Sequence, residues 1–300
     1  MDINHANLEV FFRDLGTEFT AGFNSGIETS VLTNVAMTMP SVTTASVNAW
    51  LNQIPNMRKW VGDRVVNDIE SNTLVITNDK FESTIEMKRE EIDDDEHGVY
   101  LSLASLMGQD AAMYPDELLV EALVNGETDT WTDGSTFYNN TRTFGDNTID
   151  NLVELALSAT TFQTAYQNMT SYIGHSDKPL KVIPKYLIHG PSNRTTVFDI
   201  LKNDFVANSY AAVRNSNQNL VTAVQSSRLV GDDAAKWFLC GEIAGIRGPV
   251  WQDRQKPEFQ TSRLSPDSDY VFETDKFQFG TRMRGKAFLS MPQLIVGGIA

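Results

Sequence analysis

Cysteine, basic residues and long apolar runs are all scarce in this sequence. It has a single cysteine, Cys240, in 300 residues, so no internal disulfide can form. No window approaches the roughly 18 consecutive apolar residues of a membrane-spanning helix. The first residues, MDINHANLEVFF, show neither the basic region nor the apolar region of a secretory signal. These absences predict a protein with no membrane partner that is made and kept in a reducing cytoplasm.

Basic residues are outnumbered by acids. The chain has 24 Lys and Arg against 39 Asp and Glu, a formal net charge of −15 at pH 7. A protein whose main task is to grip a phosphate backbone needs Lys and Arg gathered on one face. The charge balance therefore argues against nucleic-acid binding as the function.

Signatures of catalysis are absent as well. Four histidines lie far apart in the chain, no G-x-S-x-G motif occurs, and the glycines of GEIAGIRG fit no nucleotide-binding spacing. Cys240, within FLCGE, has the surroundings of a buried strand residue. The sequence predicts no catalytic residue, no cofactor and no metal, and it favours a structural protein over an enzyme.

One segment departs from this picture, KFESTIEMKREEIDDDEHGVY at residues 80–100. Glu91 and the acids from Asp93 to Glu96 are followed directly by His97, a composition suited to a metal or to acid–base chemistry. The spacing is not that of a calcium loop, which interleaves its ligands with a glycine and ends in a glutamate. Acids at a helix start are stabilised by the helix dipole. The sequence therefore favours a charged entry to a helix beginning near His97, and a soluble metal-assisted hydrolase using the Asp93–His97 cluster is the alternative.

Hydrophobic periodicity predicts an α+β protein. Helical spacing marks residues 8–19, 99–124, 152–173 and 190 to about 201. Pro115 predicts a kink or restart of the second of these helices near Tyr114, and Asn125-Gly126 predicts its end.

Strand-like alternation has its own pattern. It marks residues 61–87, 180–183 and 186–189 and much of the chain after residue 236, whereas the stretch 203–235 has the composition of a long loop. The run 61–87 predicts a protruding hairpin, with Asn78-Asp79 as one of its turns. Phe277, Phe279, Thr281 and Met283 alternate with polar residues, which predicts a strand with one apolar face.

Six segments carry a resemblance to a known family. They are WLNQIPNMRKWVGDRVV (50–66), ITNDKFESTIEMKREEIDDDEHGVY (76–100), MGQDAAMYPDELLVEAL (107–123), DGSTFY (133–138), KPLKVIPKYLIHGP (178–191) and VFETDKFQFGTRMRGKAF (271–288). Together they resemble the major head (capsid) subunit of Mu-like phages and prophages over almost the whole chain. The likeness is weaker at residues 1–30, at 203–235 and after DGSTFY, where this chain has Asn139 to Arg142.

The resemblance implies the Hong Kong 97-type capsid fold. By that analogy residues 1–45 form an N-terminal arm, and 46–126 form an extended hairpin loop and a peripheral domain with a long spine helix. Residues 127–260 then form the axial domain, and 261–300 the return strands of the peripheral domain.

The resemblance also implies a function. The subunit would self-assemble as pentamers and hexamers into the icosahedral head shell of the virion, inside the host cytoplasm, and enclose double-stranded DNA without sequence-specific binding. Separate scaffold, protease and portal proteins are the expected partners, and decoration proteins are optional further ones. An encapsulin-like compartment of the same fold is the alternative.

Candidate contacts between subunits lie in the predicted hairpin and in the acidic run. Apolar hairpin side chains would pack on a neighbour, and basic hairpin side chains would meet the acids of a neighbour. Packing within one chain would explain the apolar residues equally well. The candidates are Met57, Arg58, Lys59, Trp60, Arg64, Phe81, Asp93, Asp94, Asp95 and Glu96, with Trp50 beside them.

Overall fold

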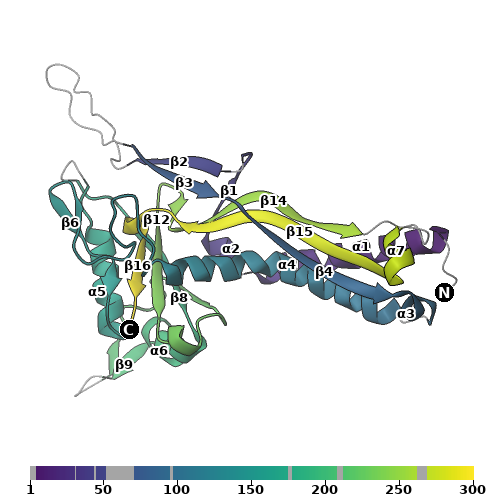
Figure 1. The fold of residues 1–300 in the computed structure, drawn as a ribbon. Coiled ribbons are helices and arrows are strands. Elements are labelled where there is room, and N and C mark those ends of the chain that lie inside the picture. The colour runs from purple at the N-terminus through teal and green to yellow at the C-terminus, as the bar shows by residue number, and fades with distance from the viewer. Residues whose placement is uncertain are drawn as a thin grey trace.

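A long body joined to a compact lobe makes up the molecule (Figure 1). The computed structural model describes residues 5–30, 32–43, 45–51, 71–94, 97–174, 178–207, 212–261 and 269–300. The first helix begins at the far end of the body, and the C-terminus lies in the lobe. Helices and sheets both contribute to each part, so the predicted α+β class is confirmed.

A four-stranded sheet in the order β1-β14-β15-β4 runs along the body. Strands β14 and β15 are long, pair antiparallel and shift register twice, which marks β-bulges. Strand β4 pairs antiparallel with β15, and β1 lies parallel to β14. The bounds are β1 Met37–Pro40, β4 Asp79–Lys88, β14 Pro249–Thr261 and β15 Lys276–Leu289.

Strand β15 has the alternation that the sequence predicted. Phe277, Phe279 and Met283 are buried, and Arg282 between them is exposed. The sheet therefore presents an apolar face to the helices of the body and a polar face away from them.

Two long helices pack beside this sheet, α1 (His5–Thr29) and α4 (His97–Asn125). They run in the same direction, because Gly22 lies against Ser105 and, further along both helices, the Ser30 hydroxyl donates to the Asp116 carboxylate at 2.8 Å. The predicted helix over residues 8–19 is confirmed as part of α1, whose buried face packs onto the aromatic residues of β15.

The backbones of α1 and α4 come unusually close at three glycines. A Cβ atom on Gly22 would lie 2.0 Å from the Ser105 carbonyl oxygen, and one on Gly108 would lie 2.1 Å from the Phe19 carbonyl oxygen. Gly26, four residues after Gly22 and so on the same helix face, would bring its Cβ within 2.6 Å of another side chain. Any side chain at these positions would hold the helices apart.

The lobe is built on a six-stranded sheet in the order β11-β8-β12-β16-β7, with β13 paired to β12. Helices α5 (Ala159–Ser171) and α6 (Arg194–Leu201) pack against it. Trp237, Phe238 and Phe162 are fully buried in its core. The strands are β7 Leu152–Val153, β8 Ile183–His189, β11 Thr222–Gln225, β12 Trp237–Ile243, β13 Ile246–Arg247 and β16 Ile295–Gly298.

The remaining elements are short. In the described part of the chain, three two-stranded ribbons join β2 with β3, β5 with β6, and β9 with β10. Their bounds are β2 Ala45–Leu51, β3 Ser71–Thr77, β5 Arg142–Phe144, β6 Asn147–Ile149, β9 Phe205–Ala207 and β10 Ala212–Arg214. The other helical pieces are α2 Leu32–Val35, α3 Arg89–Asp93 and α7 Asp269–Thr274, with 3-10 turns η1 Pro191–Asn193, η2 Gly231–Asp233 and η3 Pro292–Leu294.

The predicted turn at Asn78-Asp79 is wrong. Strand β3 passes through Asn78 directly into β4, which belongs to a different sheet, and the hairpin is formed by β2 and β3 instead. Asn78 is buried, and its side-chain oxygen accepts from the Gln252 amide at 2.9 Å. The asparagine therefore fastens a crossing point between two sheets. Residues 52–70, which connect β2 to β3 in the sequence, lie outside the described residues.

The predicted restart of the long helix at Pro115 is also wrong. Helix α4 is continuous from His97 to Asn125, and its predicted end at Asn125 is confirmed. Proline removes only one hydrogen-bond donor from the helix. Buried neighbours on both sides, Ala111 and Leu119, hold the helix in place by packing.

Three predictions for the lobe need correction. The helix expected over 152–173 is the shorter α5, preceded by strand β7. The two strands expected over 180–189 are one strand, β8, and Pro184 within it lies opposite a bulge at Cys240/Gly241. The expected loop over 203–235 contains β9, β10 and β11. The predicted helix after Gly190 and the buried Cys240 are confirmed.

Helix α4 belongs to two separate hydrophobic cores. Ala104 and Met107 in its first half are buried in the core of the body, and Leu119 and Leu123 in its second half are buried in the core of the lobe. Its length thus joins the two parts of the molecule. Among the described residues, no helix is both long enough and apolar enough to cross a membrane.

Candidate functional site

Most of the predicted contact residues fall outside the part of the chain that the structure describes. Met57, Arg58, Lys59, Trp60 and Arg64 lie in the 52–70 segment, and Asp95 and Glu96 lie between α3 and α4. Trp50 belongs to strand β2. The structure therefore describes the surroundings of three predicted site residues, Phe81, Asp93 and Asp94.

Phe81 packs within its own chain. It lies on β4, is half-buried, and meets Tyr114 of α4 edge to face, with ring centroids 5.1 Å apart. Both rings are partly buried and pack against the core of the lobe. Packing inside one chain, one of the two interpretations of this residue, accounts for these contacts.

Asp93 and Asp94 lie at the end of a short helix, which corrects the expectation that they begin the long one. Helix α3 ends at Asp93, and the Asp94 N–H closes it on the Glu90 carbonyl oxygen. Both aspartates are exposed. The negative charges therefore sit at the end of α3, where the helix dipole does not favour them.

Glu91, at the start of α3, has a defined structural role. Its carboxylate accepts the Tyr100 hydroxyl and the Lys88 backbone N–H, the second at 3.0 Å. These two hydrogen bonds hold the pKa of Glu91 below its ordinary value, and the bond from Tyr100 has the larger effect. Glu91 thereby ties α3 to the first turn of α4. Within the described ranges, no group of three His, Cys, Asp or Glu residues is placed to hold a metal ion.

An open pocket lies where body, lobe and hairpin meet, and we call it the junction pocket. Its volume is about 420 Å³. Strand β3, the second half of α4, the loop after α4 and the end of β15 line it, with Leu118, Trp131 and Phe288 among its apolar residues. A second pocket of about 370 Å³ shares Phe81 and Tyr114 with it, so this ring pair separates the two.

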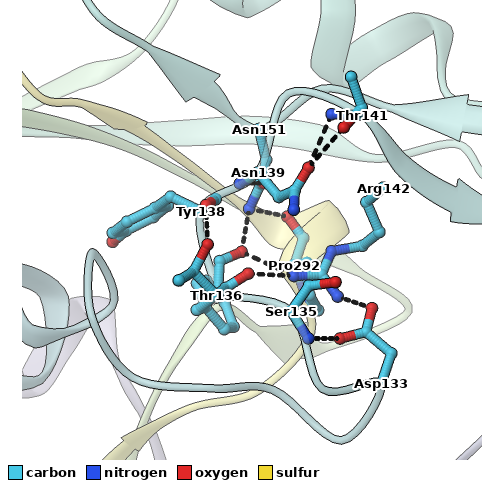
Figure 2. Close-up of polar contacts among 10 residues, drawn as sticks. Asp133, Ser135, Thr136, Tyr138, Asn139, Thr141, Arg142, Asn151 and Pro292 are labelled. Atoms are coloured by element: carbon cyan, nitrogen blue, oxygen red, sulfur yellow. Dashed lines mark hydrogen bonds and ion pairs between the residues drawn. The ribbon is translucent and has the colours of Figure 1, made fainter.

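A buried polar network fixes the loop after α4 to the lobe (Figure 2). Arg142 is buried, pairs with the Asp133 carboxylate, and donates to the backbone oxygens of Thr136 and Phe137. Asn151 is fully buried, and its amide donates to Phe137 at 3.0 Å and to Pro292 and Ile295, both at 3.2 Å. Sequence reasoning assigned no role to Arg142 or Asn151. The only available signal was a charged residue, Arg142, four positions after DGSTFY.

Large apolar side chains remain exposed on the body. Phe272 of α7 is 88% exposed, and Val99 and Leu106 of α4 are each 57% exposed. Helix α7 lies at the end of the body far from the lobe (Figure 1), and Val99 and Leu106 belong to the first half of α4. Side chains of this size cost free energy when they face water.

A carboxylate network at the far end of the body predicts a pH-dependent contact. Glu86 on β4 accepts hydrogen bonds from Lys276 at 2.8 Å and from Gln278 and Tyr270, both at 2.9 Å. These bonds lower the pKa of Glu86 from 4.5 to about 2, and the bond from Lys276 has the largest effect. A lowered pKa stabilises the fold above the ordinary value of 4.5, and this contribution is lost as the pH falls toward 2.

We therefore expect Glu86→Gln to lower the melting temperature at neutral pH. The decrease should be small, because the side chain is exposed and water screens its charge. The difference from the unmodified protein should shrink as the pH falls from about 5 to about 2. Thermal unfolding followed by circular dichroism across this range measures it. A difference that is constant with pH would contradict the role assigned to Glu86, and Glu82→Gln, an exposed acid on the same strand, is the matched control.

Comparisons with known proteins agree with one another. The family model described as Mu-like prophage major head subunit gpT matches residues 8–154 and 213–299. The major capsid protein of Escherichia phage Mu is 28% identical over 284 residues, which cover 94% of this chain and 71% of that protein.

Solved structures extend the comparison to the fold. The procapsid of bacteriophage JBD30 matches with a TM-score of 0.56 at 25% identity, over 99% of this chain and 76% of that one. A capsid of the same phage, decorated with minor capsid protein trimers, matches with a TM-score of 0.56 at 23% identity, over 67% of this chain and 91% of that one. A virus-like particle from Pyrococcus furiosus shares the fold alone, with a TM-score of 0.58 at 12% identity over 96% of this chain and 99% of that one.

The fold is thus a mixed α+β fold that matches Hong Kong 97-like capsids and encapsulin-like particles. Sequence and family separate these two groups, because the family match covers most of the chain and the matched relative is a phage capsid protein. The chain belongs to the Mu-like prophage major head subunit family, whose members are structural capsid proteins of the phage head and not enzymes.

Proposed function

We propose that this subunit builds its head shell as pentamers and hexamers that together form an icosahedron around double-stranded DNA. The observation that carries the proposal is the exposed apolar surface of the body, at Val99, Leu106 and Phe272. A partner that covered these side chains would remove their apolar surface from water, which favours association. In a shell made of many copies, the covering partner is a neighbouring subunit.

The proposed division of labour follows the two parts of the molecule. Residues 1–45 serve as the N-terminal segment, 46–126 as extended loop and peripheral domain with its spine helix, and 127–260 as axial domain. Residues 261–300 supply return strands. Two structural facts bear on this division. Helix α1 lies along α4 of its own chain. Within residues 261–300, β15 belongs to the sheet of the body and β16 to the sheet of the lobe.

The β2–β3 hairpin supports the proposed contacts between subunits. A two-stranded ribbon with no third strand is marginally stable by itself, and β2 and β3 pair only with each other among the described strands. Ile76 of β3 packs against Val250 and Phe288 of the body, and a neighbouring subunit would support the rest of the ribbon. We propose Met57, Trp60 and the basic residues near them as the donors of that contact.

Other proteins of the head complete the proposal. Scaffold, protease and portal functions belong to separate chains, and decoration proteins are a further class of partner, since a JBD30 capsid carries minor capsid protein trimers. The net charge of −15 suits a wall that encloses DNA without binding it tightly.

Electron microscopy of the purified protein tests the proposed function directly. We expect polyhedral shells, or rings of five and six subunits, to form as the protein concentration rises. A compact monomer or dimer at every concentration would contradict it. Shells that enclose a cargo protein in place of DNA when isolated from the host would favour an encapsulin-like compartment.

A further inference from the structure

We propose that the junction pocket and the second pocket together bind one linear aliphatic polyamine, a chain of methylene groups that carries at least three ammonium groups. The inference goes beyond the proposed function, because it concerns a small ligand that a single subunit holds. It is carried by the unbalanced charge of the two pockets, by the apolar surface that joins them, and by a buried hydroxyl group that has no hydrogen-bond partner.

The two pockets carry a surplus of negative charge. Among the described residues, five acids and two lysines line them. Lys286 pairs with Asp79, with Nζ and a carboxylate oxygen 2.7 Å apart, and Lys80 and Glu82 carry opposite charges at the second pocket. The three acids without a compensating cation are Asp110, Glu121 and Asp129. All three are exposed, and none forms an ion pair with a described residue, so the pockets attract cations.

These three charges are too widely spaced for one small cation. Asp110 and Glu121 lie three turns apart on one face of α4, which separates their Cα atoms by roughly 16 Å. Asp129 follows in the loop after α4. Within the described ranges, no three His, Cys, Asp or Glu residues converge on a metal site. A long cation with several charges matches this spacing, whereas a metal ion does not.

Apolar and aromatic side chains connect the acids. Phe81 and Tyr114 lie between the two pockets, with ring centroids 5.1 Å apart. Met107 lines the second pocket, and Leu118 lines the junction pocket one turn beyond Tyr114 on α4. Methylene groups would pack on Met107 and Leu118, as the stem of a lysine does on an apolar surface. An ammonium group beside the two rings would gain from cation–π attraction.

A buried hydroxyl group indicates a ligand independently of the charges. Thr281 of β15 lines the second pocket and is only 8% exposed, and its hydroxyl oxygen has no hydrogen-bond partner among the described residues. A buried polar group without a partner costs free energy. Thr281 shares its face of β15 with Phe279 and Met283, the face directed at the helices of the body. An ammonium group of the ligand would donate to this hydroxyl oxygen and pair with Asp110.

Isothermal titration calorimetry of the full, unassembled chain with spermidine tests the site. At an ionic strength of about 0.1 M the Debye length is about 10 Å, so charges distant from the ligand are screened. We expect one spermidine to bind per subunit and to saturate the site. Asp110→Asn and Glu121→Gln should each weaken binding by at least about fivefold, because each removes one carboxylate and keeps the size of the side chain.

The matched controls are Glu18→Gln and Asp146→Asn, which remove exposed acids outside both pockets. They should leave the affinity for spermidine nearly unchanged. N-acetyl-trilysine amide is the control ligand, since it carries three positive charges on the side chains of a peptide. It should bind at least about fivefold more weakly than spermidine, because three lysine side chains must be ordered.

Thr281→Val gives a readout that charge alone does not move. It should weaken spermidine binding about threefold without lowering the melting temperature, because the hydroxyl has no hydrogen bond in the free subunit. Full affinity in this variant would overturn the placement of the ligand. The inference as a whole is overturned by the absence of saturable binding, by equal losses in the test and control variants, or by equal affinity for the trilysine peptide.

Discussion

A Gly108→Ala variant is expected to lose about 2–3 kcal/mol of the free energy of unfolding. The added Cβ would lie 2.1 Å from the Phe19 carbonyl oxygen and 2.8 Å from the Phe23 backbone nitrogen. Both are backbone atoms of α1, so no side chain can rotate away to make room. The helices must separate, which opens the packed core between α1, α4 and β15. Alanine in place of glycine favours a helix by about 1 kcal/mol, which offsets part of the loss.

Urea unfolding of the unassembled subunit measures this loss. Gly98→Ala is the matched control, because Gly98 lies on the same helix and a Cβ there meets nothing within 4 Å. We expect the control to leave stability unchanged or to raise it by up to about 1 kcal/mol. Equal effects of the two substitutions would show that α1 does not pack against α4 as closely as described.

An Asn151→Ala variant is expected to lose about 4 kcal/mol, because each unpaired buried polar group costs roughly 1–3 kcal/mol. The Asn151 side-chain oxygen accepts the Asn139 N–H at 2.9 Å, and its amide shares two hydrogens among three carbonyl oxygens. These groups come from the loop after α4, from the 3-10 turn η3 and from the first residue of β16. Alanine would remove this partner from all four groups, of which the Phe137 carbonyl oxygen alone keeps the bond from Arg142.

Thermal or urea unfolding of the same unassembled subunit also tests this prediction. Asn168→Ala is the control, since its side chain is partly exposed and donates one hydrogen bond, to Asp150 at 3.3 Å. Its loss should stay below about 1 kcal/mol. If Asn151→Ala loses no more than Asn168→Ala, the network in Figure 2 does not hold the lobe together.

Periodicity predicted the elements whose burial follows a simple repeat. Helix α1 buries Leu8, Leu15 and Phe19 on one face, and β15 buries alternate residues, so the pattern in the sequence and the pattern of burial coincide. The resemblance to phage head subunits supplied the family and the expectation of assembly, which no local pattern contains.

Local patterns failed where a distant partner decides the structure. Asn78-Asp79 is a residue pair typical of turns. In the structure, Asn78 instead accepts a hydrogen bond from Gln252, far along the chain, at the point where the strand passes from one sheet to another. Pro115 is a residue that often interrupts a helix, yet packing on both sides of it keeps α4 continuous. The acids at Asp93 and Asp94 end a helix that is too short for periodicity to reveal.

The candidate site was predicted in part. The sequence singled out Phe81 without its partner Tyr114, and it could not reveal the junction pocket, whose walls come from β3, α4 and β15. Arg142 and Asn151 escaped notice because their partners, such as Asp133 and Pro292, are joined to them only by the fold. The proposed contacts of residues 57–64 stay a prediction.

Because α4 runs unbroken from the core of the body to the core of the lobe, it can transmit a rotation of the lobe to the far end of the body. Its 29 residues span roughly 43 Å. A tilt of the lobe of about 5° would therefore move the far end of the body by roughly 4 Å. In the proposed shell, rings of five and of six would require slightly different angles between neighbouring subunits. A stiff α4 would convert such differences into displacements of the far end of the body, where Phe272 and the Glu86 network lie.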